Sequence, residues 1–202
     1  MLTKTIDFPF YPNNTSQMKN KFFWLLVSIF AFGAIYYFYP ETKLPINTKI
    51  DTIIIFKSKR ELQIFFKKKL LKTYKIALGA NSVGHKHFEG DEKTPEGSYS
   101  IYKLKTSIAY KSLHINYPKI EDENYAKNHF KKPGGDICLH GIKNGFGFLY
   151  KFHRIFDWTD GCIALNNKEM DEIYNSVNSK TIVIIKPWFV NFIKSHFLAL
   201  KL

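Results

Sequence analysis

Two residues in the second half of the chain, Cys162 and His140, carry side chains that together could perform nucleophilic chemistry. With an ordinary pKa of about 8.5, a cysteine is only slightly ionised at neutral pH, so it needs a base to become an effective nucleophile. An imidazole within hydrogen-bonding distance can supply that base. The sequence therefore predicts an acyl-transfer site in which His140 takes the proton of Cys162.

Glycine residues lie beside both of these side chains. Gly161 leaves room for a substrate carbonyl next to the cysteine, and the N–H groups of residues 160–162 could stabilise the oxyanion of a tetrahedral intermediate. Gly141 lets the chain turn away from the short apolar strand that ends at the histidine. The substrate side of the site is therefore predicted to include Thr159, Asp160, Gly161 and Gly141.

The strand that ends at His140 raises two further expectations. Cys138 lies two residues earlier, so both side chains should lie on the same face of the strand. A disulfide between Cys138 and Cys162 is one alternative in an oxidising compartment, and a thiol packed in the core is the simpler one. No acidic residue is placed to orient the imidazole. We therefore expect a backbone carbonyl to bind Nδ1 and leave Nε2 facing the thiol.

Several ordered motifs surround these residues. His140-Gly141 is followed by the segment 157–165, Asp-Trp-Thr-Asp-Gly-Cys-Ile-Ala-Leu, and is preceded by the segment 90–101, which contains Thr-Pro-Glu-Gly. These motifs resemble the L,D-transpeptidase catalytic domain family, and the segment 157–165 is most similar to its YafK-like branch. The resemblance covers residues 51–187. It implies an exported, mostly β domain in which a cysteine nucleophile acts on peptidoglycan stem peptides.

One position departs from the common pattern of this family. Many members have Ser-His-Gly-Cys-Ile-Arg, whereas Ala164 stands here at the arginine position. The difference leaves two reactions open. One is transfer of the acyl group to an amine, which forms a cross-link. The other is hydrolysis of the same class of bond, by an L,D-carboxypeptidase or endopeptidase activity or by release of a lipoprotein joined to the wall. The expected partners are stem peptides and such a wall-linked lipoprotein.

A weaker group of polar residues lies upstream of the nucleophile. His85, His87 and Asp91 have an alternating spacing that could provide metal ligands, but no second cluster accompanies them and the surroundings suggest an exposed loop. The segment 94–97, Thr-Pro-Glu-Gly, is expected to form a turn that supports the cleft. Because thiolate chemistry requires neither a metal nor an organic cofactor, we expect none.

The body of the chain is typical of a mainly β protein with short helices, an α+β fold. We expect a mixed sheet that closes toward a sandwich or barrel, as in L,D-transpeptidases. Strand-like runs cover residues 52–56, 61–66, 70–78, 99–104, 112–117, 137–140 and 181–185. Helices are expected at 124–130 and 167–177, the second opened by a capping box between Asn166 and Glu169.

The first fifty residues differ in character from the rest. Residues 22–39 carry no charged side chain and are long enough to span a bilayer, and the lysines before them favour a cytoplasmic N-terminus. A signal peptide cleaved for secretion into the periplasm is the alternative. We expect a leader at 1–21, a single transmembrane anchor in the bacterial inner membrane at 22–39, a linker at 40–50, a periplasmic catalytic domain at 51–187 and an amphipathic helix at 188–202.

The formal net charge of +13 admits anionic partners. The lysines are scattered apart from 67–69, and no nucleic-acid motif accompanies them, so a nucleic acid is not expected to bind. The inner membrane remains an expected partner. A different class of function also stays open, a catalytically silent wall-binding module for which Cys162 would be dispensable. A papain-like protease is disfavoured, since that family places cysteine before histidine.

Overall fold

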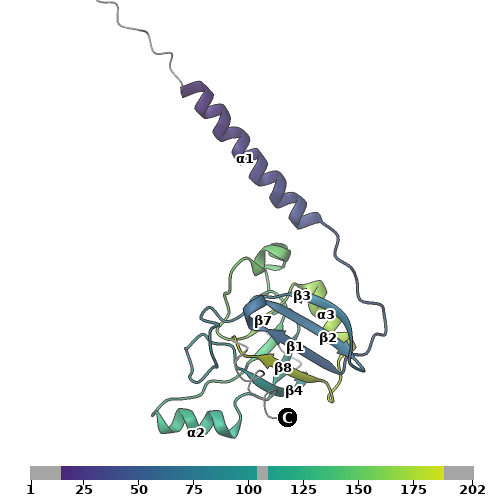
Figure 1. The fold of residues 1–202 in the computed structure, drawn as a ribbon, viewed down its shortest axis with the longest axis vertical. Helices are drawn as coiled ribbons and strands as arrows, with labels where there is room; N and C mark the ends of the chain where they lie inside the picture. The colour runs from purple at the N-terminus through teal and green to yellow at the C-terminus, as the bar shows by residue number, and fades with distance from the viewer. Residues whose placement is uncertain (1–14, 104–108, 189–202) are drawn as a thin grey trace, which may run out of the picture. The chain divides into compact units, whose positions relative to one another are not determined.

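The computed structural model describes residues 15–103 and 109–188 (Figure 1). The chain divides into two units, with the boundary between Glu41 and Thr42. The first unit is dominated by the helix α1 (Thr15–Phe38). Within it, the 22-residue stretch Gln17–Phe38 is long and apolar enough to cross a membrane, a property that it shares with signal sequences. The predicted helix at 188–202 lies outside the described residues apart from its first residue.

In the described part of the second unit, eight strands form one mixed sheet in the order β3-β2-β1-β8-β4-β5-β6-β7. The strands are β1 (Thr52–Phe56), β2 (Glu61–Phe66), β3 (Lys69–Lys75), β4 (Gly97–Lys103), β5 (Ser112–Ile115), β6 (Cys138–His140), β7 (Ile163–Ala164) and β8 (Ile182–Lys186). The pairs β1–β8 and β6–β7 are parallel, and the remaining pairs are antiparallel. The prediction of a mainly β, mixed-sheet fold is therefore confirmed.

The sheet curls back on itself beyond β3. The N–H of Ala77 donates to the carbonyl of Ala164 at 3.0 Å, and the N–H of Ala164 donates in return at 2.9 Å. This bridge joins the segment after β3 to β7, which is the opposite end of the sheet order. The predicted strand 70–78 consequently ends at Lys75, because the residues that follow leave β2 and pair with β7.

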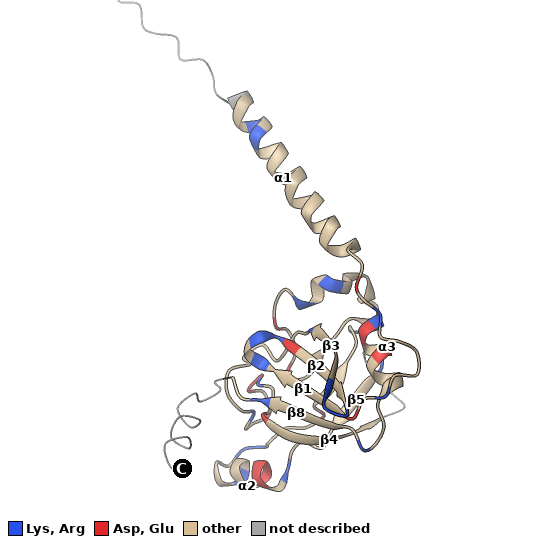
Figure 2. Cartoon of the chain, turned by 45° about the vertical axis from the view of Figure 1, so that its right-hand side comes forward, with Lys and Arg blue, Asp and Glu red and all other residues tan. Residues whose placement is uncertain are grey.

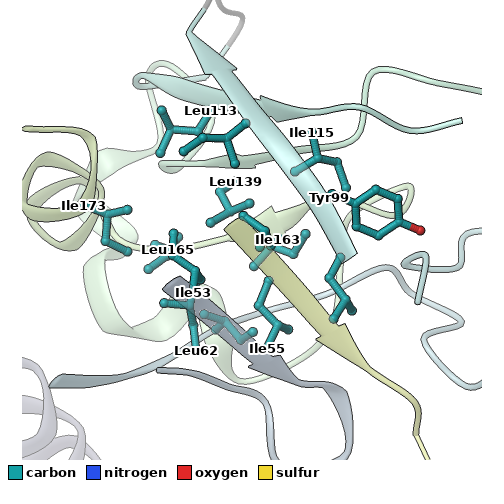
Figure 3. Packing of buried hydrophobic residues seen from close by; sticks show 14 of the residues in the cluster. Ile53, Ile55, Leu62, Tyr99, Leu113, Ile115, Leu139, Ile163, Leu165 and Ile173 are labelled. Atoms are coloured by element: carbon teal, nitrogen blue, oxygen red, sulfur yellow. The ribbon is translucent and has the colours of Figure 1, made fainter. Parts of the chain in front are cut away.

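The hydrophobic core lies between the curled sheet and the helix α3 (Asn167–Ser176) (Figure 3). On β1, Ile53 and Ile55 are fully buried and stand opposite Ile64 and Leu62 of β2. Successive strand residues point to opposite faces, so this register collects apolar side chains on one face. The runs 52–56 and 61–66 agree with the predicted strands because their alternation is so regular.

Helix α3 confirms the predicted capping box. The side chain of Asn166 accepts the N–H of Glu169 at 3.0 Å, and the carboxylate of Glu169 accepts the N–H of Asn166 at 3.0 Å. Each bond satisfies a backbone donor that the first turn of a helix leaves unpaired. The helix ends at Ser176, one residue before the predicted end.

The prediction for the other helix was wrong in its position. Helix α2 spans Ile120–Asn128 and begins four residues before the predicted start at 124. Its first turn is fixed by Asp122, whose carboxylate accepts the N–H of Lys119 at 2.9 Å. The predicted end at Phe130 fails because this residue has a positive φ of 56°, which no α-helix continues through.

Two short 3-10 helices complete the described elements, η1 (Lys57–Lys59) and η2 (Gly147–Arg154). Lysine and arginine residues occur on strands, helices and connections of the second unit, and acidic residues occur on α2 and α3 (Figure 2). The basic residues are therefore spread over the unit, as the sequence indicates.

Candidate functional site

The parallel pairing of β6 with β7 brings the two cysteines together. Leu139 stands opposite Ile163, and His140 stands opposite Ala164. One residue earlier in the same register, Cys138 stands beside Cys162, and their Sγ atoms are 3.7 Å apart. The nucleophile candidate thus lies at the start of one strand and contacts a thiol at the start of its neighbour.

His140 is held by its own backbone turn. Its Nδ1 lies 2.6 Å from the carbonyl oxygen of Gly141, so Nδ1 carries the proton and donates it to this oxygen. The remaining nitrogen, Nε2, is then the one that can interact with the thiol of Cys162, and each of these two side chains shifts the pKa of the other. The expectation that a backbone carbonyl orients the imidazole is confirmed.

The environment favours the ionised form of Cys162. Hydrogen bonds from the thiol of Cys138 and from His140 lower the pKa of Cys162 to about 5, although its burial opposes the shift. Burial alone would lower the pKa of His140, but its bond to the Cys162 thiolate and the charge of that thiolate raise it above the usual value. The two shifts together favour a thiolate–imidazolium ion pair at neutral pH.

The pKa of Cys138 shifts in the opposite direction to that of Cys162. Its hydrogen bond to Cys162, together with burial, raises the pKa of the Cys138 thiol. The neutral thiol can therefore stay protonated and donate to the thiolate, which also accepts the backbone N–H of Cys138. Of the two cysteines, only Cys162 is arranged to be a nucleophile at neutral pH.

The turn before Cys162 is closed by Thr159. The hydroxyl of Thr159 donates to the carbonyl of Cys162 at 2.7 Å and accepts the N–H of Gly161 at 3.2 Å. Thr159 is buried, whereas Asp160 is exposed on the same turn. Because the N–H of Gly161 is bonded within the turn, the candidate oxyanion donors in 160–162 are reduced to the N–H groups of Asp160 and Cys162.

Gly141 and Gly161 both allow a close approach of another backbone segment. A Cβ on Gly141 would lie 2.5 Å from the carbonyl oxygen of Tyr110, and a Cβ on Gly161 would lie 2.5 Å from the carbonyl oxygen of Lys93. Gly161 also has a φ of 129°, which side-chain-bearing residues rarely adopt. Both glycines are thus required by packing as well as by access to the cysteine.

Replacing Gly161 with alanine is expected to displace the turn that carries Cys162. The new methyl group would collide with the carbonyl of Lys93, and a displacement near 1 Å at a reacting group can reduce the rate about 100-fold. The rate at which iodoacetamide alkylates Cys162 measures the effect. Gly145→Ala is the matched control, because Gly145 also has a positive φ, 88°, but a Cβ there meets nothing within 4 Å. Equal effects of both substitutions would contradict the prediction.

The loop before β4 packs behind this turn. The carboxylate of Asp91 accepts the N–H groups of His87, Phe88 and Lys93 at 2.8, 3.0 and 3.0 Å, and it pairs with the ammonium of Lys86 at 2.8 Å. These bonds fix the position of Lys93, whose carbonyl touches Gly161. The turn expected at 94–97 is not formed: residues 94–96 are an extended connection after Lys93, and Gly97 is the first residue of β4.

The polar residues considered as metal ligands are bonded to protein groups. The Nδ1 of His85 accepts the N–H of Glu96 at 2.9 Å, and its Nε2 lies 2.8 Å from the carboxylate of Asp122. The oxygens of Asp91 bind backbone N–H groups and Lys86. Within residues 15–103 and 109–188, no group of three or more histidine, cysteine and acidic side chains is arranged to hold a metal ion.

Sequence reasoning missed the structural role of Asp157. One carboxylate oxygen accepts the N–H of Leu78 at 2.9 Å, and the other binds the guanidinium of Arg60 at 2.8 Å and the hydroxyl of Ser82 at 3.1 Å. These bonds tie the connection that leads to Cys162 onto the sheet. The only available signal was the place of Asp157 in the family-like segment.

Asp157→Asn is expected to lower the free energy of unfolding by about 1–3 kcal/mol, because an amide offers one acceptor oxygen and turns an N–H₂ group toward the remaining donors. Urea unfolding followed by tryptophan fluorescence measures the change. Asp160→Asn is the matched control, since Asp160 is exposed in the same connection. A loss no greater than that of Asp160→Asn would contradict a bonding role for Asp157.

The pairing of β5 with β6 places two further polar residues on the sheet face that carries Cys138 and His140. Ser112 stands opposite His140, and His114 stands opposite Cys138. Directly opposed residues of antiparallel strands share a face, and both side chains are buried. The hydroxyl of Ser112 lies 3.3 Å from Nε2 of His114, while Nδ1 of His114 is buried with no hydrogen-bond partner in the described structure. The alternating sequence Ser-Leu-His was the signal for this pair.

An apolar cavity of about 440 Å³ is lined in part by Trp158, whose indole meets the ring of His140 edge-on with 5.7 Å between the ring centroids. It is lined mainly by the connection that contains η2, including Phe146, Leu149 and Phe152. The sequence does not predict the helical turn of this connection or its apolar lining.

A curled mixed sheet that carries a cysteine–histidine pair on neighbouring parallel strands defines a class of β-rich protein with a thiol-based site. The family model for the L,D-transpeptidase catalytic domain (YkuD) matches residues 50–185. The match covers well over half of the chain, and the chain belongs to this family.

Known relatives agree with this assignment. The chain is 30% identical over 137 residues to the protein named "Putative L,D-transpeptidase YafK" of Escherichia coli (strain K12), with 64% of this chain and 48% of that protein covered. It therefore spans about half the length of the curated relatives that it matches. Among solved structures, the helical cell shape determining protein Pgp2 (K307A mutant) from Campylobacter jejuni has a similar fold. The TM-score is 0.51 at 24% identity, over 70% of this chain and 48% of that one.

Proposed function

We propose that this protein is a peptidoglycan-modifying cysteine acyltransferase of the L,D-transpeptidase type. Its thioester intermediate would form between Cys162 and a stem peptide. The observation that carries the proposal is the parallel pairing of β6 with β7, which places Cys162 beside the strand of Cys138 and His140, with 3.7 Å between the two Sγ atoms and Nδ1 of His140 bonded to a backbone carbonyl. This placement lowers the pKa of Cys162 to about 5. A thiolate that is present at neutral pH next to an imidazolium is the arrangement that acyl transfer requires.

In the proposed first half-reaction, the thiolate of Cys162 attacks a carbonyl carbon of the stem peptide. The negative charge that develops on the carbonyl oxygen is stabilised by the N–H groups of Asp160 and Cys162. The tetrahedral intermediate collapses when the C–N bond breaks, and the leaving amine takes the proton from Nε2 of His140. The product is a thioester on Cys162 and a released amine.

In the second half-reaction, His140 acts as the base. It removes a proton from the incoming nucleophile, which attacks the thioester carbon, and the thiolate of Cys162 leaves. An amine of a second stem peptide as nucleophile gives a cross-link, whereas water gives a free carboxylate. Both outcomes use the same two residues and require no metal or organic cofactor.

Hydrolysis is the second candidate reaction, and one position favours it. Ala164 stands where many family members have arginine, and it is fully buried with both backbone groups bonded to Ala77. No cationic side chain is therefore supplied from this position to bind a substrate carboxylate. The hydrolase alternative includes L,D-carboxypeptidase and endopeptidase activities, as well as the release of a wall-linked lipoprotein.

The proposed location is the periplasmic face of the bacterial inner membrane. The apolar stretch Gln17–Phe38 supports a single-pass anchor. Lys4, Lys19 and Lys21, which precede the uncharged run 22–39, support a cytoplasmic N-terminus. Secretion into the periplasm after cleavage of a signal sequence is the alternative. N-terminal sequencing of the mature protein from membrane and soluble fractions distinguishes the two.

The test of the reaction uses the full-length protein in detergent with defined muropeptides and with wall that carries attached lipoprotein. Mass spectrometry reads both the protein and the products. An acyl adduct on Cys162 with a new cross-linked product supports transpeptidation, and an adduct with only shortened or released products supports hydrolysis. Binding of muropeptides without an adduct or a new product would contradict both and favour the wall-binding module.

A further inference from the structure

Cys138 is placed beside the nucleophile in a way that packing alone does not require. On β6 the alternation of side chains points Leu139 into the hydrophobic core, whereas Cys138 and His140 point to the face that carries the site. The side chain of Cys138 is buried and contacts Cys162, with 3.7 Å between the two Sγ atoms.

The backbone geometry at this point suits a covalent bond between the two sulfurs. Neighbouring strands lie about 4.8 Å apart, and disulfides link Cα atoms that are about 4.4–6.8 Å apart. Cys138 and Cys162 continue the parallel register of β6 with β7, so strand spacing places their Cα atoms near this range. Closing the bond then requires the sulfurs to move from 3.7 Å to the roughly 2.05 Å of a disulfide.

We propose that Cys138 is a resolving cysteine that closes a reversible disulfide with Cys162 under oxidising conditions and thereby withdraws the nucleophile. The existence of this disulfide depends only on the two thiols, whereas its consequence, a reversible loss of acyl transfer, rests on the proposed function. The oxidant is an external disulfide, such as oxidised glutathione or the active disulfide of a thiol oxidase.

The disulfide forms by two successive thiol–disulfide exchange steps. First, the thiolate of Cys162 attacks one sulfur of the external disulfide, whose S–S bond breaks as one thiolate leaves and a mixed disulfide forms on Cys162. Second, Cys138 loses its proton to solvent, attacks the Cys162 sulfur and expels the second external thiolate. The two protein thiols are oxidised to one disulfide, and the external disulfide is reduced to two thiols.

The surroundings assign the two roles to the two cysteines. Cys162 is partly exposed and carries the lowered pKa, so it is the thiolate that meets an oxidant from solution. Cys138 is buried, and its pKa is raised, so it reacts poorly with external reagents. Contact with Cys162 still allows it to resolve the mixed disulfide from within the protein.

The test incubates the full-length protein in detergent with oxidised glutathione, then unfolds it in urea, alkylates all free thiols with iodoacetamide and measures the intact mass. Wild type is expected to lose both alkylation sites and two hydrogens without gaining a glutathionyl group. Cys138→Ala is expected to gain one glutathionyl group on Cys162 and to keep it. Cys162→Ala is expected to remain alkylated at Cys138. Cys138→Ser, which keeps the size of the side chain, repeats the measurement if the alanine variant is unstable.

The outcome is independent of whether the proposed function is correct. If wild type retains a glutathionyl group as Cys138→Ala does, or stays alkylated at both cysteines, the resolving role is overturned. If the disulfide forms and dithiothreitol restores activity on muropeptides, the regulatory consequence is supported. If the disulfide forms but the reduced protein is inert on muropeptides, the sulfur chemistry stands, and the proposed function and the regulatory consequence fail.

Discussion

Cys162→Ala is expected to abolish acyl transfer, with a decrease in turnover of roughly a thousandfold or more. The reason is that the thioester can form only on this sulfur, and among the described residues the other cysteine, Cys138, is a buried thiol with a raised pKa. Turnover is measured by mass spectrometry of muropeptide products from the full-length protein. The acyl adduct should disappear from the protein at the same time.

The control for this substitution is binding. The side chain of Cys162 interacts with Cys138 and His140 and donates a 3.6 Å hydrogen bond to the carbonyl of Asp136, and alanine removes only the sulfur atom. Cys162→Ala should therefore keep its thermal midpoint and its affinity for muropeptides. Unchanged product formation in a folded variant would rule out the cysteine mechanism.

Local patterns made the central pair predictable. Two local features identified this pair: the glycine directly before Cys162 and the apolar strand that ends at His140. Both are visible in residues that are close in the sequence. Strand alternation and the capping box at Asn166 are local in the same sense, so the fold class and most strand positions followed from them. The start of α2 was missed because the cap at Asp122 satisfies a backbone group that hydrophobic periodicity does not report.

Contacts between distant segments could not be predicted in the same way. Asp157 binds Arg60 and Leu78, which are 97 and 79 residues away in the sequence. No spacing rule connects such positions, and only the pairing of strands brings them together. For Cys138 and Cys162 the sequence offered proximity only as one of two alternatives, since a one-residue change in the register of β6 with β7 would place different residues opposite each other. Register therefore decides which thiol the nucleophile meets.

His140→Gln is expected to reduce acyl transfer by about 10²–10⁴-fold, the usual contribution of a general acid–base group. Glutamine can keep a hydrogen bond but can neither carry the positive charge nor transfer the proton. Wild-type activity should rise with pH through the lowered pKa of Cys162, about 5, and fall as His140 loses its proton above its raised pKa. The variant loses the imidazolium that stabilises the thiolate, so the pKa of Cys162 rises.

Rates of iodoacetamide alkylation against pH measure this shift independently of any muropeptide substrate. In the variant, alkylation of Cys162 should begin at a higher pH than in wild type, and the residual activity should increase toward alkaline pH instead of falling. His129→Gln is the matched control, because His129 is exposed at the end of α2 and bonds to the carbonyl of Tyr125 away from the site. An unchanged alkylation profile in His140→Gln would mean that Cys138, and not the imidazole, holds the thiolate in its ionised form.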